Sequence, residues 1–371
     1  MLCGKLCVGV GSARSAHREP HSFGVSDELL LVVVRRRLLH GRVRLCRLVR
    51  PRALRRLVLG LEQRALLGLL GLLDPTCNMI LLVAAAAAVP MTFRVATYNI
   101  DCRVCDLSHG HAPSWKVQAQ RERDVLQEIN ADVVFLQEPV FPGDAAQILP
   151  TTRNWTILYD NGTAPIPLLP TFDPDATLAV DADRFAVDDW GYTWLGPRPS
   201  HPGSFDIFTL PRLAVWAHVH DRRTQGSMVL MSTHFDHGDG TGKSTGPSST
   251  NCVQAAREIA TLLRNDTRFA DRPFIFGGDL NSKRASNAYQ ILLNTTLQET
   301  WDAAPAVNHT IFANSSSSAA AYDTTQAIDH ILATPHFSVL AAGASVRVWE
   351  AKGKLVGPSD HWPVFADFQL A

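Results

Sequence analysis

The chain has 371 residues, enough for one large domain or two of ordinary size. Its 35 basic and 35 acidic residues balance, but residues 1–90 carry fourteen Lys or Arg against five Asp or Glu, and residues 91–371 carry 21 against 30. The net charge of −9 on the larger part argues against a polyanionic substrate held by neutralising its backbone, unless a bound metal offsets that charge locally.

Residues 1–90 are predicted to be a non-catalytic leader of basic and apolar composition. The stretch Val32–Arg64 is rich in Leu, Val and Arg. That pattern is typical of a transit segment or of a basic helix at a membrane surface. A third interpretation, which we favour, is that the segment lies outside the mature protein, for example because the start was mis-assigned upstream. Residues 79–90 have the size and composition of a signal-peptide apolar region, although a buried helix is the competing interpretation. They are too few to span a bilayer.

Asparagine usage favours a protein of the secretory pathway. Six of the eleven Asn residues in 91–371 head an Asn-x-Ser/Thr sequon, where Ser and Thr frequency alone predicts roughly two. A Thr-rich surface is the alternative explanation. We expect a secreted glycoprotein, or a cytoplasmic protein if the leader is not a signal. The six sequon residues are Asn154, Asn161, Asn265, Asn294, Asn308 and Asn314.

The body of the chain, residues 91–371, begins with a strand–helix–strand pattern. Residues 93–100 alternate like a strand, and Trp115–Asn130 has helical periodicity with Val125, Leu126 and Ile129 on its apolar face. A short apolar run, Val133–Leu136, then predicts a buried strand that ends at Gln137-Glu138. This alternation indicates an α/β layer arrangement.

The middle of the chain is looser and rich in Pro, Gly and Asp. Short strands are expected at Trp155–Tyr159 and Thr177–Val180, and the aspartates between Asp181 and Asp189 predict a solvated acidic loop. Two apolar strands follow at Leu213–Val219 and Met228–Thr233. An amphipathic helix is predicted at Val253–Leu263.

The stretch Phe274–Ser282 joins a buried strand to a polar pair. Gly277-Gly278 end the strand where the backbone must pass close to another group. Asp279 and Asn281 follow two residues apart, so in extended chain they point to the same side. An Asx turn after the strand is the simpler alternative. A low-complexity loop is expected at residues 315–321. Two further strands, Ala327–Ala333 and Asp360–Phe368, then close the chain.

Polar side chains gather at the ends of these apolar strands. They comprise carboxylates, carboxamides and imidazoles without a Ser or Cys nucleophile set, and their oxygens suit a hard cation such as Mg²⁺ or Mn²⁺. The histidines then serve in acid–base work or bind phosphate oxygens. Cys102-x-x-Cys105 fits a redox motif or half of a zinc site, but no second pair completes one, so packing or a local disulfide is expected. The strand-end residues are Asn99, Glu138, His234, Asp279, Asn281, Asp329, Asp360 and His361.

As an ordered set, these short motifs resemble those of the endonuclease/exonuclease/phosphatase superfamily, in its secreted or microbial Thr-His-x-Asp-His branch, over residues 92–371. The resemblance implies an α/β fold, a four-layer α/β sandwich of two packed mixed β-sheets flanked by helices. The motifs are, in chain order, Thr97-Tyr-Asn99, Gln137-Glu138, Thr233-His234-Phe-Asp-His237, Gly277-Gly-Asp279-Leu-Asn281, Ile328-Asp329-His330 and Ser359-Asp360-His361.

The resemblance also implies a role for each motif residue. Glu138 would be the principal metal ligand, with Asn99 and Asp360 completing the metal region. His361 would lie at the scissile phosphate and be oriented by Asp329.

Three further residues complete the implied catalytic machinery. Asp279 would position or deprotonate the attacking water, and Asn281 and His234 would hold phosphate oxygens. Arg212 fits either an additional phosphate contact or a strand-end surface charge. Between Asn161 and Asp183 the chain departs from the family, with a Pro-rich and acidic stretch where a strand closing in Tyr-Arg is expected.

The predicted function is therefore that of a Mg²⁺-dependent phosphoesterase, with Mn²⁺ as an alternative ion. A small molecule or sugar phosphate is the favoured substrate, and we expect a monomer without a stable membrane span. The alternatives are a deoxyribonuclease-like nuclease, a phospholipid phosphodiesterase, and a non-catalytic binding module of the same fold.

Overall fold

The chain divides into two compact units, Met1–Ala87 and Ala88–Ala371. The computed structural model describes residues 5–8, 32–35, 45–46, 90–103, 105, 114–158, 175–198, 211–236, 247–313, 322–351 and 353–370. In the first unit, β1 (Lys5–Val8), β2 (Val32–Arg35) and β3 (Leu45–Cys46) form an antiparallel sheet of order β1-β2-β3. The signal-like segment up to residue 89 lies outside the described residues.

Two large sheets form the second unit. The seven-stranded sheet has the order β13-β15-β18-β4-β5-β7-β6, and the six-stranded sheet has the order β12-β14-β11-β10-β9-β8. The first sheet comprises β4 (Met91–Asn99), β5 (Val133–Gln137), β6 (Trp155–Leu158), β7 (Ala176–Asp181), β13 (His309–Phe312), β15 (Phe337–Ser345) and β18 (Val364–Leu370). The second comprises β8 (Phe185–Trp194), β9 (Leu213–Asp221), β10 (Ser227–His234), β11 (Phe274–Asp279), β12 (Gln298–Glu299) and β14 (Asp329–Ala333).

Both sheets are mixed, and two of their parallel pairs are joined by helical crossovers, whereas β13 and β15 pair in parallel with β14 of the other sheet between them in the sequence. Helix α4 (Trp115–Ile129) connects the parallel strands β4 and β5, and α6 (Pro247–Asn265) connects β10 and β11. The face of α4 that carries Val125, Leu126 and Ile129 is buried, as predicted. Because parallel strands end at the same edge of a sheet, each crossover brings two strand ends together.

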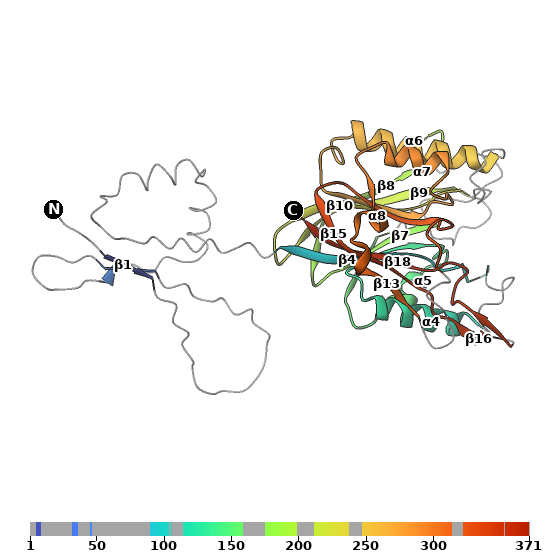
Figure 1. The fold of residues 1–371 in the computed structure, drawn as a ribbon, viewed down its shortest axis with the longest axis horizontal. Coiled ribbons are helices and arrows are strands. Elements are labelled where there is room, and N and C mark those ends of the chain that lie inside the picture. The colour runs from blue at the N-terminus through green and yellow to red at the C-terminus, as the bar shows by residue number, and fades with distance from the viewer. Residues whose placement is uncertain are drawn as a thin grey trace, which may run out of the picture. The chain divides into compact units, whose positions relative to one another are not determined.

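Four layers follow from how the apolar side chains are distributed. Along β5, Val133 and Phe135 belong to the core between the two sheets, whereas Val134 and Leu136 pack under α4 and α5 (Asp144–Ile148). On the other side, the six-stranded sheet packs against α6 and α7 (Asn287–Leu293). The two helix pairs therefore cover opposite outer faces of the stacked sheets (Figure 1). This confirms the predicted four-layer α/β sandwich.

Smaller elements complete the second unit. Helix α8 (Thr300–Ala303), the 3₁₀ turn η1 (Ala306–Asn308) and the hairpin of β16 (Trp349–Ala351) and β17 (Lys354–Val356) lie between the longer elements in the sequence. Within the parts of the chain that the structure describes, no helix is long and apolar enough to cross a membrane.

Two local predictions differ from the structure. The expected acidic loop is largely the strand β8, with Asp189 exposed on it. As the edge strand of its sheet, β8 tolerates carboxylates facing solvent, and such charges protect an edge from further pairing. The last strand begins at Val364 rather than Asp360, because Pro363 has no N–H to donate to a ladder and residues 358–361 form a bend.

Candidate active site

The candidate site is built at strand ends that the sheet register places side by side. Asn99 ends β4 opposite Gln137, so Glu138 follows directly beside it. In the other sheet His234 ends β10 opposite Asp279 at the end of β11. Asp279 is in turn paired with Asp329, the first residue of the antiparallel strand β14.

Gly278 makes the close approach of β10 and β11 beside Asp279 feasible. Its φ is +146°, and a Cβ there would lie 1.8 Å from the carbonyl oxygen of Thr233. The next turn is an Asx turn, because the Asn281 backbone N–H donates to Asp279 Oδ1 at 2.8 Å. The chain after Asp279 is therefore the Asx turn rather than an extended segment, with Asn281 at a φ of 45°, and this turn places the Asn281 carboxamide nitrogen 3.1 Å from His234 Nε2.

Asp279 is the centre of the cluster and is 1% exposed. Its Oδ2 accepts a hydrogen bond from Asn99 Nδ2 at 3.1 Å and lies 3.3 Å from His234 Nε2 and 3.7 Å from His361 Nε2. Burial alone would raise the pKa of this carboxyl, but the two imidazoles and the Asn281 N–H lower the pKa below its ordinary value. Asp279 is therefore an ionised acceptor at neutral pH.

His361 faces a second buried carboxylate. Its Nδ1 lies 2.8 Å from Asp329 Oδ2, and its backbone N–H donates to Ser359 Oγ at 3.0 Å. Burial opposes charging of this imidazole, but the carboxylates of Asp329 and Asp279 raise the pKa of His361 well above its ordinary value. Burial, with the charge of Asp279, raises the pKa of Asp329 despite the imidazole. The ring is thus held as an imidazolium with Nε2 turned toward Asp279.

His234 is surrounded by a buried network that the sequence reasoning largely missed. Its Nδ1 lies 3.2 Å from Asp175 Oδ2 and 3.0 Å from Arg212 Nη1, and Asp175 and Arg212 form an ion pair. Its Nε2 lies 3.1 Å from Asn281 Nδ2. Arg212 is 3% exposed, so it is not a surface charge, and burial lowers the pKa of its guanidinium.

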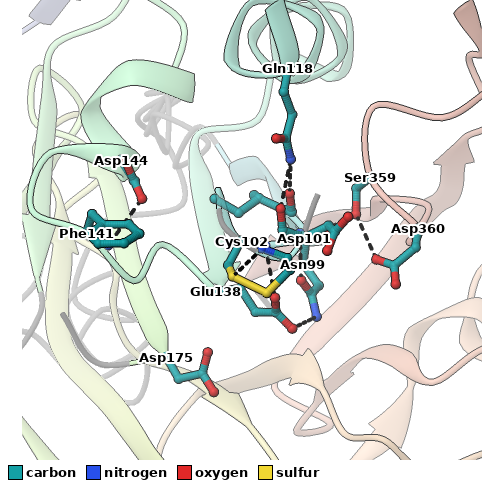
Figure 2. The surroundings of a disulfide bond; sticks show 12 residues. Asn99, Asp101, Cys102, Gln118, Glu138, Phe141, Asp144, Asp175, Ser359 and Asp360 are labelled. Atoms are coloured by element: carbon teal, nitrogen blue, oxygen red, sulfur yellow. Dashed lines mark hydrogen bonds between the residues drawn. A yellow bond between two sulfur atoms is a disulfide. The ribbon is translucent and has the colours of Figure 1, made fainter. Parts of the chain in front are cut away.

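Glu138 lies beside Asn99, and its backbone N–H donates to the Asp175 carbonyl oxygen at 3.2 Å. The Asn99 amide donates to Glu138 Oε1 at 3.0 Å, and the Cys102 backbone N–H donates to Oε2 at 3.0 Å (Figure 2). Each oxygen keeps a further lone pair for a cation. Asn99 Oδ1 accepts a hydrogen bond from the Asp101 backbone N–H. Because Asn99 Nδ2 donates to both Glu138 and Asp279, this amide connects the two carboxylates.

The donor set around Glu138 fits a hard divalent cation. Cys102 and Cys105 are the nearby sulfur residues, and they are joined in a disulfide, which removes the thiolates that a soft metal would need. The remaining ligands are oxygens, as Mg²⁺ prefers. The buried carboxylate of Asp101, which the sequence reasoning did not select, lies beside Asn99 (Figure 2).

Asp360 lies at the exposed edge of the cluster. Its side chain is 43% exposed, and Oδ1 is 3.9 Å from His361 Nε2. Ser359 Oγ donates to the Asn99 carbonyl oxygen at 2.7 Å and thereby ties the turn that carries Asp360 to the end of β4. The predicted site residues thus come from both sheets and meet at one edge.

A pocket of about 400 Å³ opens beside His361 and Asp360. Two aromatic rings and several hydrogen-bonding side chains line it, and no Lys or Arg is among the described residues that line it. They are Tyr322, Asp323, Gln326, Ala327, Ile328, Asp329, Asp360, His361 and Trp362.

Known proteins share both the sequence pattern and the fold. The model of the Endonuclease/Exonuclease/phosphatase family matches residues 96–361. An endonuclease/exonuclease/phosphatase family protein from Bacteroides thetaiotaomicron has a similar structure, with a TM-score of 0.61 and 21% identity, covering 76% of this chain and 96% of that one. No curated protein sequence matches the chain.

Two further solved structures have the same fold. A mannosyl-6-phosphatase from Bacteroides thetaiotaomicron has a TM-score of 0.59 and 20% identity, covering 74% of this chain and 99% of that one. The human Nocturnin catalytic domain with bound sulfate has a TM-score of 0.53 and 14% identity, covering 76% of this chain and 95% of that one. At these identities the likeness establishes the fold alone.

Proposed function

Because the chain belongs to the endonuclease/exonuclease/phosphatase family, whose members are hydrolases acting on phosphate esters, we propose that it is a divalent-metal-dependent phosphoesterase for a small hydroxylated substrate, with sugar phosphates favoured. One observation carries the proposal. The ionised carboxylate of Asp279 is buried between the imidazoles of His234 and His361, and Asn99 links it to Glu138. This set matches what hydrolysis of a phosphate ester needs: an acceptor for water, donors for phosphate oxygens and an anionic metal ligand.

Asp279 positions the attacking water in this mechanism. Its lowered pKa makes it a weak base but a permanent hydrogen-bond acceptor, so it aligns a water for in-line attack on phosphorus. The Asn281 N–H and the Asn99 amide hold this carboxylate in place from two sides. Fixing the acceptor before reaction reduces the reorganisation needed in the transition state.

His361 stabilises the negative charge that grows on the phosphate oxygens. Asp329 engages Nδ1, which leaves the Nε2–H of the imidazolium, 3.7 Å from Asp279 Oδ2, to donate to a phosphate oxygen placed between them. His234 at the end of β10 and Asn281 in the turn that follows Asp279 would supply further donors for phosphate oxygens. Arg212 and Asp175 position His234 through their contacts with its Nδ1.

Glu138 would hold the divalent cation, with Asp360 at the exposed edge and Asn99 fixing the carboxylate. A bound Mg²⁺, or Mn²⁺, would neutralise charge on the phosphate and so favour the transition state. The structural support is the oxygen donor set, which a disulfide keeps free of thiolates.

The pocket beside His361 supports a small substrate with hydroxyl groups. Its volume of about 400 Å³ lies in the range of small-molecule sites. The rings of Trp362 and Tyr322 suit the apolar face of a sugar, and Asp323 and Gln326 suit its hydroxyls. A nucleic-acid backbone would instead be expected to meet several Lys and Arg. The described residues that line the pocket include none, although Lys283 donates to one of them, Gln326.

A turnover screen with Mg²⁺, with Mn²⁺ and with excess chelator tests the proposal. It includes sugar monophosphates, small phosphodiesters, a phospholipid and duplex DNA, with Asp279→Asn as the inactive control. We expect metal-dependent release of phosphate from one or more sugar monophosphates and none from Asp279→Asn. Full turnover after chelation would refute the metal requirement, preferential cleavage of DNA would favour the nuclease, and binding without turnover would favour a non-catalytic module.

The sequons and the disulfide lead us to propose passage through the secretory pathway as well. The sequon residues Asn154, Asn265, Asn294 and Asn308 are exposed, and disulfides persist in oxidising compartments. Expression of the full chain in eukaryotic cells, followed by peptide-N-glycosidase digestion, tests this. A mass loss on digestion is expected, and an unglycosylated intracellular product would refute it.

A further inference from the structure

The disulfide between Cys102 and Cys105 touches the candidate metal site. The Cys102 backbone N–H donates to Glu138 Oε2, and one carboxylate oxygen of Glu138 lies within 4.8 Å of both sulfur atoms (Figure 2). Cys102, Arg103 and Cys105, called here the disulfide turn, lie three to six residues after Asn99, the last residue of β4. Glu138 is therefore held on one side by Asn99 and on the other by this turn.

Local contacts fix the disulfide turn from two directions. The Cys105 N–H donates to the Cys102 carbonyl oxygen at 2.7 Å, and the S–S bond closes the same turn. On the outside, Arg103 forms an ion pair with the buried Asp144, and its guanidinium lies 4.9 Å from the ring centroid of Trp115. The bridge thus holds the side that faces Glu138, whereas Arg103 holds the outer side.

General stabilisation of the fold is a weak explanation for this bridge. The two cysteines are three residues apart, and a bridge that closes so short a loop restricts the unfolded chain less than one that closes a long loop. The neighbouring β4 and α4 are already packed into a core through Tyr98, Leu126 and Ile129. The contact of Cys102 with Glu138 therefore explains the position of this disulfide better than general stabilisation of the fold does.

We propose that the disulfide turn is a redox-dependent positioning element for Glu138. With the bridge intact, the Cys102 N–H is aimed at Oε2 and the carboxylate is oriented for a divalent cation. With the bridge reduced, the turn loses its closure on the Glu138 side and the affinity for the cation falls. The inference rests on the proposed function, since it takes Glu138 as the principal metal ligand.

The reduction step needs a dithiol reductant. Cys105 is the more exposed partner, so a reductant thiolate attacks its sulfur, the S–S bond breaks and Cys102 leaves as a thiolate that takes up a proton. The second thiol of the reductant then resolves the mixed disulfide and releases the thiol of Cys105. In total two electrons and two protons pass to the protein, and the reductant becomes a disulfide.

Mn²⁺ binding, measured by titration calorimetry and by the electron paramagnetic resonance signal of free Mn²⁺, tests the proposal independently of turnover. The full chain with its disulfide intact is compared with the Cys102→Ser/Cys105→Ser double variant. We expect the double variant to bind Mn²⁺ about 10- to 100-fold more weakly, as is usual when a group that orients a metal ligand is lost. Excess Mn²⁺ should then restore kcat, which a merely unfolded variant would not show.

Two controls separate the outcomes. Cys252→Ser alters a buried cysteine that is free among the described residues, and it should leave Mn²⁺ affinity unchanged. If the double variant does not fold, the wild-type protein reduced by a phosphine, with its newly exposed thiols counted, replaces it. Unchanged Mn²⁺ affinity after loss of the bridge would overturn the inference, as would unfolding of both forms. Failure of the oxidised wild type to bind Mn²⁺ would instead count against the proposed metal site at Glu138, and so against the inference built on it.

Discussion

Replacing Asp329 by Asn tests whether His361 acts as an imidazolium at the phosphate. Asp329 Oδ2 lies 2.8 Å from His361 Nδ1, and the two side chains are 9% and 15% exposed. A hydrogen bond between charged groups contributes about 1.5–3 kcal/mol. At about 1.36 kcal/mol per factor of ten, losing the charge should slow turnover on the order of 10- to 100-fold. The loss stays partial because Asp279 still faces Nε2 at 3.7 Å.

The same substitution has a signed effect on the pH profile. The carboxylates of Asp329 and Asp279 raise the pKa of His361, so activity that needs the imidazolium is fully present at low pH and is lost as pH rises through this raised pKa. Removing one of the two charges lowers the pKa of His361. The alkaline limb of kcat/KM in Asp329→Asn should therefore move to lower pH.

The assay is a pH series of kcat/KM with a saturating divalent cation, accompanied by melting temperatures. Asp302→Asn is the matched control, because Asp302 is an exposed partner of Arg284. An unchanged alkaline limb and unchanged turnover in Asp329→Asn would refute the assigned pair. So would a pattern in which Asp329→Asn and His361→Ala lower the melting temperature but spare the turnover of the folded molecules.

Four further predictions concern other parts of the site and chain. Glu138→Gln should weaken Mn²⁺ binding by roughly 10- to 100-fold in calorimetry without changing the circular dichroism spectrum. Gly278→Ala should lower the free energy of unfolding in urea by at least about 2 kcal/mol, because its Cβ would meet the Thr233 carbonyl oxygen at a strained φ. Asp175→Asn should cost about 1.5–3 kcal/mol of unfolding free energy in the same assay, since the buried Arg212 would lose one charged hydrogen-bond partner while the carboxylates of Asp236, Glu138 and Asp279 remain. A chain shortened to residues 90–371 should retain kcat and KM, because the candidate site lies within the second unit.

Strand ends explain why much of the site could be predicted from the sequence. Short apolar runs that end in Asn99, Glu138 or Asp279 predict both a strand and the polar side chain at the end of that strand. The pairing of β10 with β11 then brings His234 opposite Asp279, as expected for strands joined by a helical crossover. Local periodicity and short motifs contain this information because each element spans only a few residues.

The rest depends on pairing between distant segments. Asp175 reaches the site because β7 pairs with β5, and the Glu138 N–H donates to the Asp175 carbonyl oxygen at 3.2 Å. Nothing next to Asp175 in the sequence indicates that neighbour. Strand β15 was not predicted because its residues Ala341–Ser345 are small, and Gly343 leaves room for the ring of Phe365 on β18. Its strand character comes from packing rather than from β-propensity.

The charge of the site connects its chemistry to the composition of the chain. Residues 91–371 carry a net −9, and the site itself gathers the carboxylates of Glu138, Asp279, Asp329 and Asp360. Against them stand the imidazolium of His361 and Arg212, whose charge is engaged by Asp175. Such a cluster repels a phosphate ester unless a cation is bound first. The acidity that argues against a polyanionic substrate is therefore also an argument for the divalent metal that we propose, and for the proposed small ester, which brings one phosphate to the site.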